Sequence, residues 1–151
     1  MRVTRLGHAG LTIGQMERSL AFYGGILGFE IVSRRVIDAP WLARVLGLDA
    51  AVVDAADLAV SGTDQVLQLF AFVEPSVPAV TPAMPAAGSV HVAFVVEGLS
   101  SLLERFADAG VALLAPPVVI TTGGNAGGRL VCVTDPDGIV VEFFEEPAMP
   151  V

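Results

Sequence analysis

The sequence predicts an α+β fold made of two copies of one βαβββ module, and three observations carry that prediction. A short apolar motif containing a histidine occurs twice, once near the start of each half. In both halves a strand-like segment is followed by a helix-like segment and then by more strand-like segments. A stretch with four prolines separates the halves. We expect a first module at 1–74, a linker at 75–88 and a second module at 89–151, in one compact domain.

The first half follows the βαβββ order from its periodicity. A helical spacing of apolar residues runs over 15–27, and Gly28 follows it where a helix C-terminus favours glycine. Pro40 is compatible with the start of a short connecting helix. Alternating, β-rich segments predict strands at 4–13, 29–36, 50–60 and 65–72, with a turn at 61–64 between the last two.

The second half repeats that order. A helix is expected at 99–109, with Gly110 ending it. Asp135-Pro136-Asp137-Gly138 is typical of a tight turn, and the two aspartates are interpreted as turn formers. Strands are expected at 90–96, 111–114, 118–122, 129–134 and 139–144.

Composition excludes several classes of function. Eight basic residues, all of them arginine, face sixteen acidic residues for a net charge of −8, so no basic surface for nucleic acid is expected. No apolar run reaches the roughly 18 residues of a membrane span, and no secretory signal is recognisable at the start. The single Cys132 cannot form an internal disulfide, which favours a reducing, cytoplasmic setting.

Four residues at matched places in the two halves are candidate metal ligands. The only two histidines, His8 and His91, open equivalent strands, and Gln68 and Glu142 lie in equivalent closing strands. If the modules pair about a pseudo-twofold axis, these four side chains can converge. Two imidazoles and two side-chain oxygens suit one divalent first-row metal ion, which the sequence leaves open among Zn, Ni, Co, Mn and Fe.

The chain resembles the vicinal oxygen chelate superfamily, which contains glyoxalases, methylmalonyl-CoA epimerases, bleomycin-resistance proteins and extradiol dioxygenases. The segments that carry the resemblance are 7–13, 21–29, 91–96 and 135–143. It implies that the two modules form a half-open mixed β-barrel around the metal. The combination of His8, Gln68, His91 and Glu142 is most similar to the epimerase branch.

The resemblance also implies a function. We expect a metal-dependent isomerase, epimerase or lyase that moves a proton next to a metal-chelated carbonyl, with Glu142 as the catalytic base. The epimerase branch uses a further acidic residue near the third strand, where Asp49 and Asp54 lie, although neither aligns with it. The expected substrate is a small molecule with vicinal oxygens and an apolar portion, and a homodimer is expected.

Two other functions stay open at this stage. One is sequestration of a drug by a protein of the bleomycin-resistance type, although such binders commonly lack the metal ligands. The other is an iron-dependent extradiol dioxygenase, in which Gln68 would occupy a position that is normally open.

Overall fold

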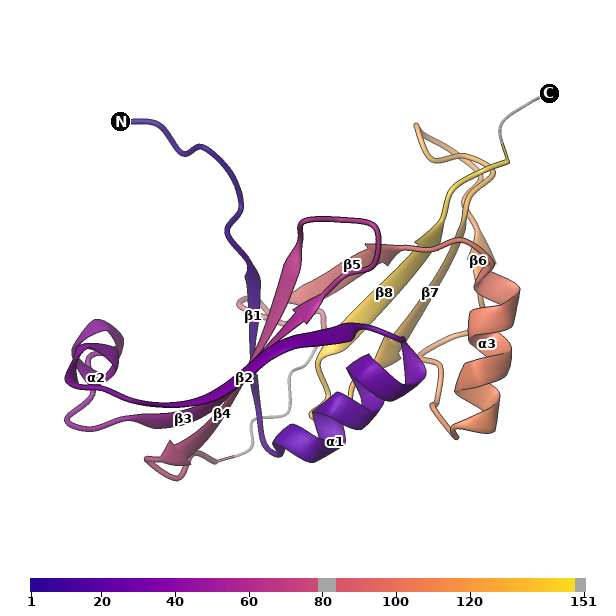
Figure 1. Ribbon diagram of the computed structural model, residues 1–151. Helices are drawn as coiled ribbons and strands as arrows, with labels where there is room; N and C mark the ends of the chain where they lie inside the picture. Colours follow the sequence, from indigo (N-terminus) through magenta and orange to yellow (C-terminus); the bar gives the residue numbers. More distant parts are fainter. Residues whose placement is uncertain (79–83, 149–151) are drawn as a thin grey trace. The chain divides into compact units, whose positions relative to one another are not determined.

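The computed structural model describes residues 1–78 and 84–148, and the chain divides into two compact units, Met1–Val80 and Thr81–Val151. The division falls within the segment 75–88. Each unit contains one four-stranded mixed sheet (Figure 1). The α+β class is therefore confirmed.

The first unit has the strand order β1-β4-β3-β2, in which β1 is parallel to β4 and the other pairs are antiparallel. Its elements are β1 (Ala9–Ile13), α1 (Met16–Leu20), the π-helix η1 (Ala21–Ile26), β2 (Glu30–Asp38), α2 (Pro40–Leu46), β3 (Val52–Ala59) and β4 (Val66–Glu74).

The second unit has the equivalent order β5-β8-β7-β6, again with its first and last strands parallel. Its elements are β5 (His91–Val95), α3 (Leu99–Asp108), β6 (Val118–Val119), β7 (Arg129–Thr134) and β8 (Val140–Glu145). The repeated βαβββ order is present in both units, and α2 is an addition in the first. Both sheets are open, with an edge strand at each end.

One face of the first sheet packs against α1 and η1. Leu58 and Leu69, which lie on this face of β3 and β4, are fully buried, as is Tyr23 of η1. Arg34 of β2 lies on the same face and forms an ion pair of 2.6 Å with Glu17 of α1. This face is the helix-covered face of the first sheet.

The second sheet also has one helix-covered face, on which α3 lies (Figure 1). The ring centroids of Phe106 in α3 and Phe143 in β8 are 5.3 Å apart, and both residues are buried. Glu145, two residues further along β8, accepts hydrogen bonds from the backbone N–H groups of Gly98 and Leu99 at the start of α3. The carboxylate therefore satisfies donors that have no partner inside the helix.

Three predicted strands are shorter in the structure, and the one expected at 118–122 is limited to β6, Val118–Val119. Residues 4–8 are not a strand, because β4 begins at Val66 and offers no partner before Ala9, which pairs with Leu67. The expected strand at 111–114 is reduced to one bridge between Leu113 and Val133. The prolines that follow at 116 and 117 have no N–H to extend the pairing.

The helix expected at 15–27 is present, but its second half is wound as a π-helix. The N–H of Leu27 reaches the carbonyl of Phe22, five residues earlier. The expected turn at 135–138 is confirmed, since the Asp135 carboxylate accepts from the N–H groups of Asp137 and Ile139.

Candidate metal site

The two candidate ligand pairs occupy the same position in their sheets. In the first unit Gly10, two residues after His8, pairs with Gln68 across β1 and β4. In the second unit Ala93, two residues after His91, pairs with Glu142 across β5 and β8. Because strand side chains alternate between faces, His91 lies on the same face of its sheet as Glu142. His8 precedes β1, and its ring lies beside the position of a Cβ on Gly10, on the face of Gln68. We call this the ligand face of each sheet.

The ligand face is opposite α1 and η1 in the first unit and opposite α3 in the second, whereas α2 packs on the ligand face of the first sheet through Leu42 and Ala43. Gln68 is adjacent in β4 to Leu69, which is buried on the helix-covered face, and Glu142 is adjacent in β8 to Phe143, which contacts α3.

His8 lies just before β1 and over its first residues. A Cβ atom placed on Gly10 would lie 3.9 Å from Nε2 of His8 and 3.9 Å from Cε2 of Phe70. The imidazole and the phenyl ring therefore flank Gly10 on the ligand face. At these distances an added Cβ would make only ordinary van der Waals contact with the two rings.

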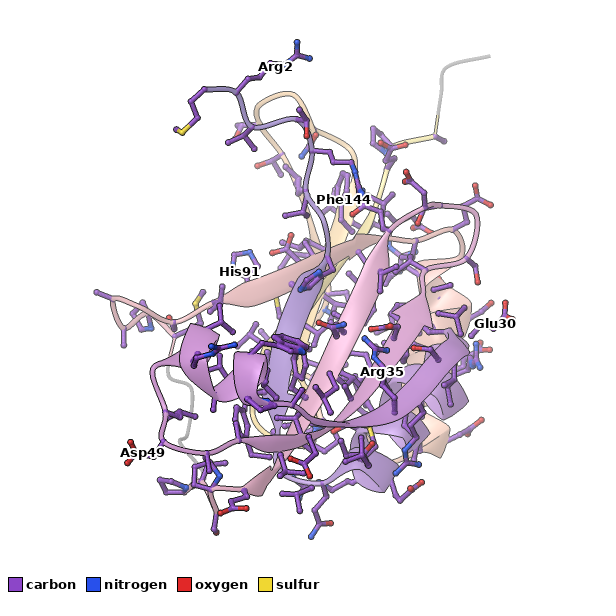
Figure 2. The ribbon with its side chains drawn as sticks, turned by 60° about the vertical axis from the view of Figure 1, so that its left-hand side comes forward. Arg2, Glu30, Arg35, Asp49, His91 and Phe144 are labelled. Carbon is purple, nitrogen blue, oxygen red and sulfur yellow. The ribbon has the colours of Figure 1, made fainter. Side chains whose placement is uncertain are left out.

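His91 opens β5 (Figure 2), and its Nε2 atom is 3.9 Å from Oε2 of Glu142. That distance is too long for a hydrogen bond. It is short enough for both atoms to reach one ion, because each metal–ligand bond to nitrogen or oxygen is about 2.0–2.2 Å long. Both side chains retain access to solvent.

Gln68 is held by a polar network on β2 and β3. Its Nε2 donates to Oδ1 of Asp57, 2.6 Å away. The other oxygen of Asp57 accepts from Ser33 Oγ at 2.8 Å and from Arg35 Nη1 at 2.6 Å. Figure 2 shows Arg35 on β2.

The charge of Asp57 is stabilised by this network. Partial burial alone would raise the pKa of its carboxyl, but hydrogen bonds from Arg35, Gln68 and Ser33 outweigh burial and hold that pKa below its usual value. Asp57 is therefore an ionised, acceptor-only group beside the amide of Gln68 at neutral pH.

Sequence reasoning missed Asp57, Ser33 and Arg35 as residues of the site. A signal for Asp57 was available in the predicted turn at 61–64. A hairpin closed there pairs Val60 with Gln65, and counting outward places Asp57 opposite Gln68, as the structure has it.

Asp49 and Asp54, the two acidic residues near the third strand that were considered beside the epimerase branch, lie elsewhere. Asp54 pairs with Ala71, on the helix-covered face, and its carboxylate binds Arg34 at 2.8 Å. Asp49 lines a separate pocket beside α2.

Cys132 lies on the ligand face of the second sheet, where it is the cross-strand partner of Glu142. Partial burial, and secondarily the charge of Glu142, raise the pKa of its thiol. A protonated thiol is a weak nucleophile. A structural role for Cys132 is therefore favoured over a nucleophilic one.

The donor set of the four candidates fits a divalent metal. It comprises two imidazole nitrogens, one carboxylate and one amide oxygen, and the amide of Gln68 is oriented through its nitrogen, which leaves Oε1 free to ligate. Each unit contains one of the two candidate histidines and one of the two candidate oxygen ligands. Within residues 1–78 and 84–148, no three His, Cys, Asp or Glu side chains gather as a metal site.

Comparison with known proteins then decides the family. The glyoxalase/bleomycin resistance protein/dioxygenase superfamily matches residues 5–143. The chain belongs to this superfamily. It is 28% identical over 144 residues to a 2-epi-5-epi-valiolone epimerase from an Actinomyces species, covering 93% of this chain and 79% of that protein. It is 26% identical over 146 residues to the Bacillus subtilis protein YwkD, covering 97% of this chain and all of that protein.

Solved structures of the superfamily share the fold. A glyoxalase family protein from Bacillus cereus superimposes with a TM-score of 0.85 at 22% identity, covering 98% of this chain and 97% of that one. The fosfomycin resistance protein FosX from Listeria monocytogenes superimposes with a TM-score of 0.66 at 15% identity, covering 97% of both chains. In the described part of the chain, no helix has the length and apolar character that a membrane crossing requires.

Proposed function

We propose that this protein is a divalent-metal-dependent epimerase or related isomerase or lyase that moves a proton next to a carbonyl group. The observation that carries the proposal is the identical register of the two ligand pairs, His8 with Gln68 and His91 with Glu142. An epimerase among the relatives of this chain supports the same reaction class.

In this proposal His8, Gln68, His91 and Glu142 hold one ion, Zn, Ni, Co, Mn or Fe. The ion, when bound, supplies Lewis acidity that stabilises negative charge on a substrate oxygen. The two histidines and the Gln68 amide are neutral ligands, and Glu142 contributes a single negative charge. The site therefore keeps a net positive charge.

Glu142 has a second role as the base. One of its carboxylate oxygens takes the proton from the carbon next to the substrate carbonyl, and a proton delivered from solvent to the opposite face inverts the carbon. Phe70 and Phe144 lie on the ligand faces beside Gln68 and Glu142. Their rings favour a substrate that joins two vicinal oxygens to an apolar portion.

Bringing four ligands together requires the first and second units to meet, either within one chain or between two chains. The proposal includes a homodimer, because β2 is an edge strand whose Val32 and Val36 side chains are 52% and 65% exposed. Apolar edge strands are surfaces that proteins commonly cover. Light scattering at several concentrations should give twice the chain mass, and a constant monomer mass would exclude the dimer.

Proton exchange with solvent tests the reaction directly. Protein reconstituted with Co²⁺ is incubated in D₂O with 2-epi-5-epi-valiolone and, separately, with small 2-hydroxy and 2-oxo acids, and loss of the C–H signal is followed by NMR. We expect exchange next to the carbonyl of at least one compound, and its loss in Glu142→Gln. The exposed Glu146→Gln is the matched control and should retain exchange. Exchange that persists in Glu142→Gln would refute the role of Glu142 as the base.

The alternative of a metal-free drug-binding protein makes a different prediction. Such a protein would hold an apolar drug equally well after removal of metal by a chelator. Four intact candidate ligands favour the enzyme.

A further inference from the structure

Only one orientation of the Gln68 amide allows a hydrogen bond with Asp57. Oδ1 of Asp57 lies 2.6 Å from its Nε2 atom, and an ionised carboxylate can only accept hydrogen bonds. If the amide were flipped, Oε1 would face Asp57 as an unfavourable pair of acceptors. The amide nitrogen therefore faces Asp57, and the amide oxygen is left for another partner.

Asp57 is itself fixed in place. Ser33 Oγ and Arg35 Nη1 both donate to its other oxygen, and Arg35 Nη1 also donates to Ser33 Oγ at 2.6 Å. Three strands thus contribute to one network, β2 through Ser33 and Arg35, β3 through Asp57 and β4 through Gln68. The carboxylate cannot turn away from Gln68 without losing two further hydrogen bonds.

We infer that Asp57 is a positioning residue, which fixes the Gln68 amide so that its oxygen, and not its nitrogen, is presented to the metal ion. This inference rests on the proposed function, because it gives Asp57 a role only if Gln68 is a ligand. A side-chain amide ligates a metal ion through its oxygen and not through its nitrogen. Its orientation therefore matters as much as its position.

The second unit supports this inference by contrast. The position of Asp57 across from Gln68 corresponds to the position of Cys132 across from Glu142. A carboxylate has two equivalent oxygens and presents a ligand atom whichever way it turns. An orienting carboxylate is thus present beside the amide, which needs one, and is replaced by a thiol beside Glu142, which does not.

The test is the affinity for Co²⁺, measured by titration of metal-free protein for the parent, Asp57→Asn, Gln68→Ala and the double variant. The asparagine side chain can donate or accept, so Asp57→Asn permits both orientations of Gln68. We expect this variant to raise the dissociation constant about 10–100-fold, the range that loss of an outer-shell partner typically causes. In the Gln68→Ala background the same change should have little further effect, because no amide remains to be oriented.

Asp54→Asn is the matched control. Asp54 is also on β3 and also paired with an arginine, but it lies on the helix-covered face. This variant should bind Co²⁺ as the parent does, and circular dichroism should show that all variants are folded.

The outcomes separate the two proposals. An unchanged affinity in Asp57→Asn, with normal binding by the parent, overturns the positioning role and leaves the metal site standing. If Asp57→Asn lowers the affinity for Co²⁺ equally in the parent and in Gln68→Ala, the positioning role is also overturned. The effect would then act through charge or stability and not through Gln68. Failure of the parent to bind Co²⁺ overturns the proposed function, and the positioning role with it.

Discussion

Glu142 and Glu145 lie three residues apart on β8, and their side chains lie on opposite faces of the second sheet. Glu145 binds the start of α3 and lies 3.1 Å from Nη1 of Arg129, whereas Glu142 faces Cys132 and lies near His91. One strand thus carries a carboxylate that stabilises the fold and a carboxylate that is available for chemistry. The two roles can be separated by substitution.

Glu145→Gln should lower the Tm by a few degrees at neutral pH without affecting metal binding. Hydrogen bonds from the N–H of Leu99, together with Arg129, hold the pKa of Glu145 below its usual value. A lowered pKa in the folded state stabilises the protein above the pKa of the unfolded chain. That contribution is lost as the pH falls through the folded value. Thermal unfolding from pH 7 to pH 3 measures the difference.

The difference in Tm between Glu145→Gln and the parent should therefore shrink below about pH 5, where the unfolded carboxyl begins to protonate. Glu146→Gln, an exposed neighbour, should match the parent throughout. A pH-independent difference for Glu145→Gln would contradict the assigned cause.

Gln68→Glu should destabilise the metal-free protein, because it places a second carboxylate against Asp57 at the position now 2.6 Å from that residue. Like charges directly across a strand pair cost about 0.2–1 kcal/mol, and partial burial raises the cost. Urea unfolding at pH 7 in the presence of a chelator measures it. Adding Asp57→Asn should restore stability, since the asparagine amide can donate to the introduced carboxylate. An unaltered stability of Gln68→Glu would show that the hydrogen bond is absent in solution.

Gly128→Ala should destabilise the second unit by roughly 1–3 kcal/mol, the usual cost of overpacking. A Cβ at Gly128 would lie 2.5 Å from Cε2 of Phe144 and 2.9 Å from the carbonyl oxygen of Glu145. Gly124→Ala is the control, because a Cβ there meets no atom within 4 Å. Equal unfolding midpoints of the two variants in urea would count against this packing.

Much of the fold could be predicted from the sequence because the residues that begin or end its helices and turns are easy to recognise. Gly28 and Pro40 mark element ends, and Asp135 caps the turn before β8. The errors fall where pairing depends on a distant partner. Residues 4–8 precede a clear strand, but the neighbouring strand β4 begins only at Val66 and gives them no partner. Propensity alone does not record where a neighbouring strand begins.

The candidate site was predictable in part. Histidines are rare in this chain, so His8 and His91 were conspicuous, and the registers agree with their pairing to Gln68 and Glu142. Asp57 was not conspicuous, because it is one of sixteen acidic residues. Its importance comes from the hairpin register, which places it across from Gln68, and from donors on β2 that are far away in the sequence.

Metal stoichiometry tests whether both units contribute ligands to one ion. Metal-free protein is equilibrated with Co²⁺, freed of unbound ion and analysed for cobalt, for the parent, His8→Ala, His91→Ala and Glu142→Gln, with Glu145→Gln as the control. We expect one ion per chain in the parent and the control. We expect a large loss of cobalt in each of the other three, including His8→Ala from the first unit and His91→Ala from the second. A parent that retains no cobalt, or a full ion in either histidine variant, would contradict this expectation.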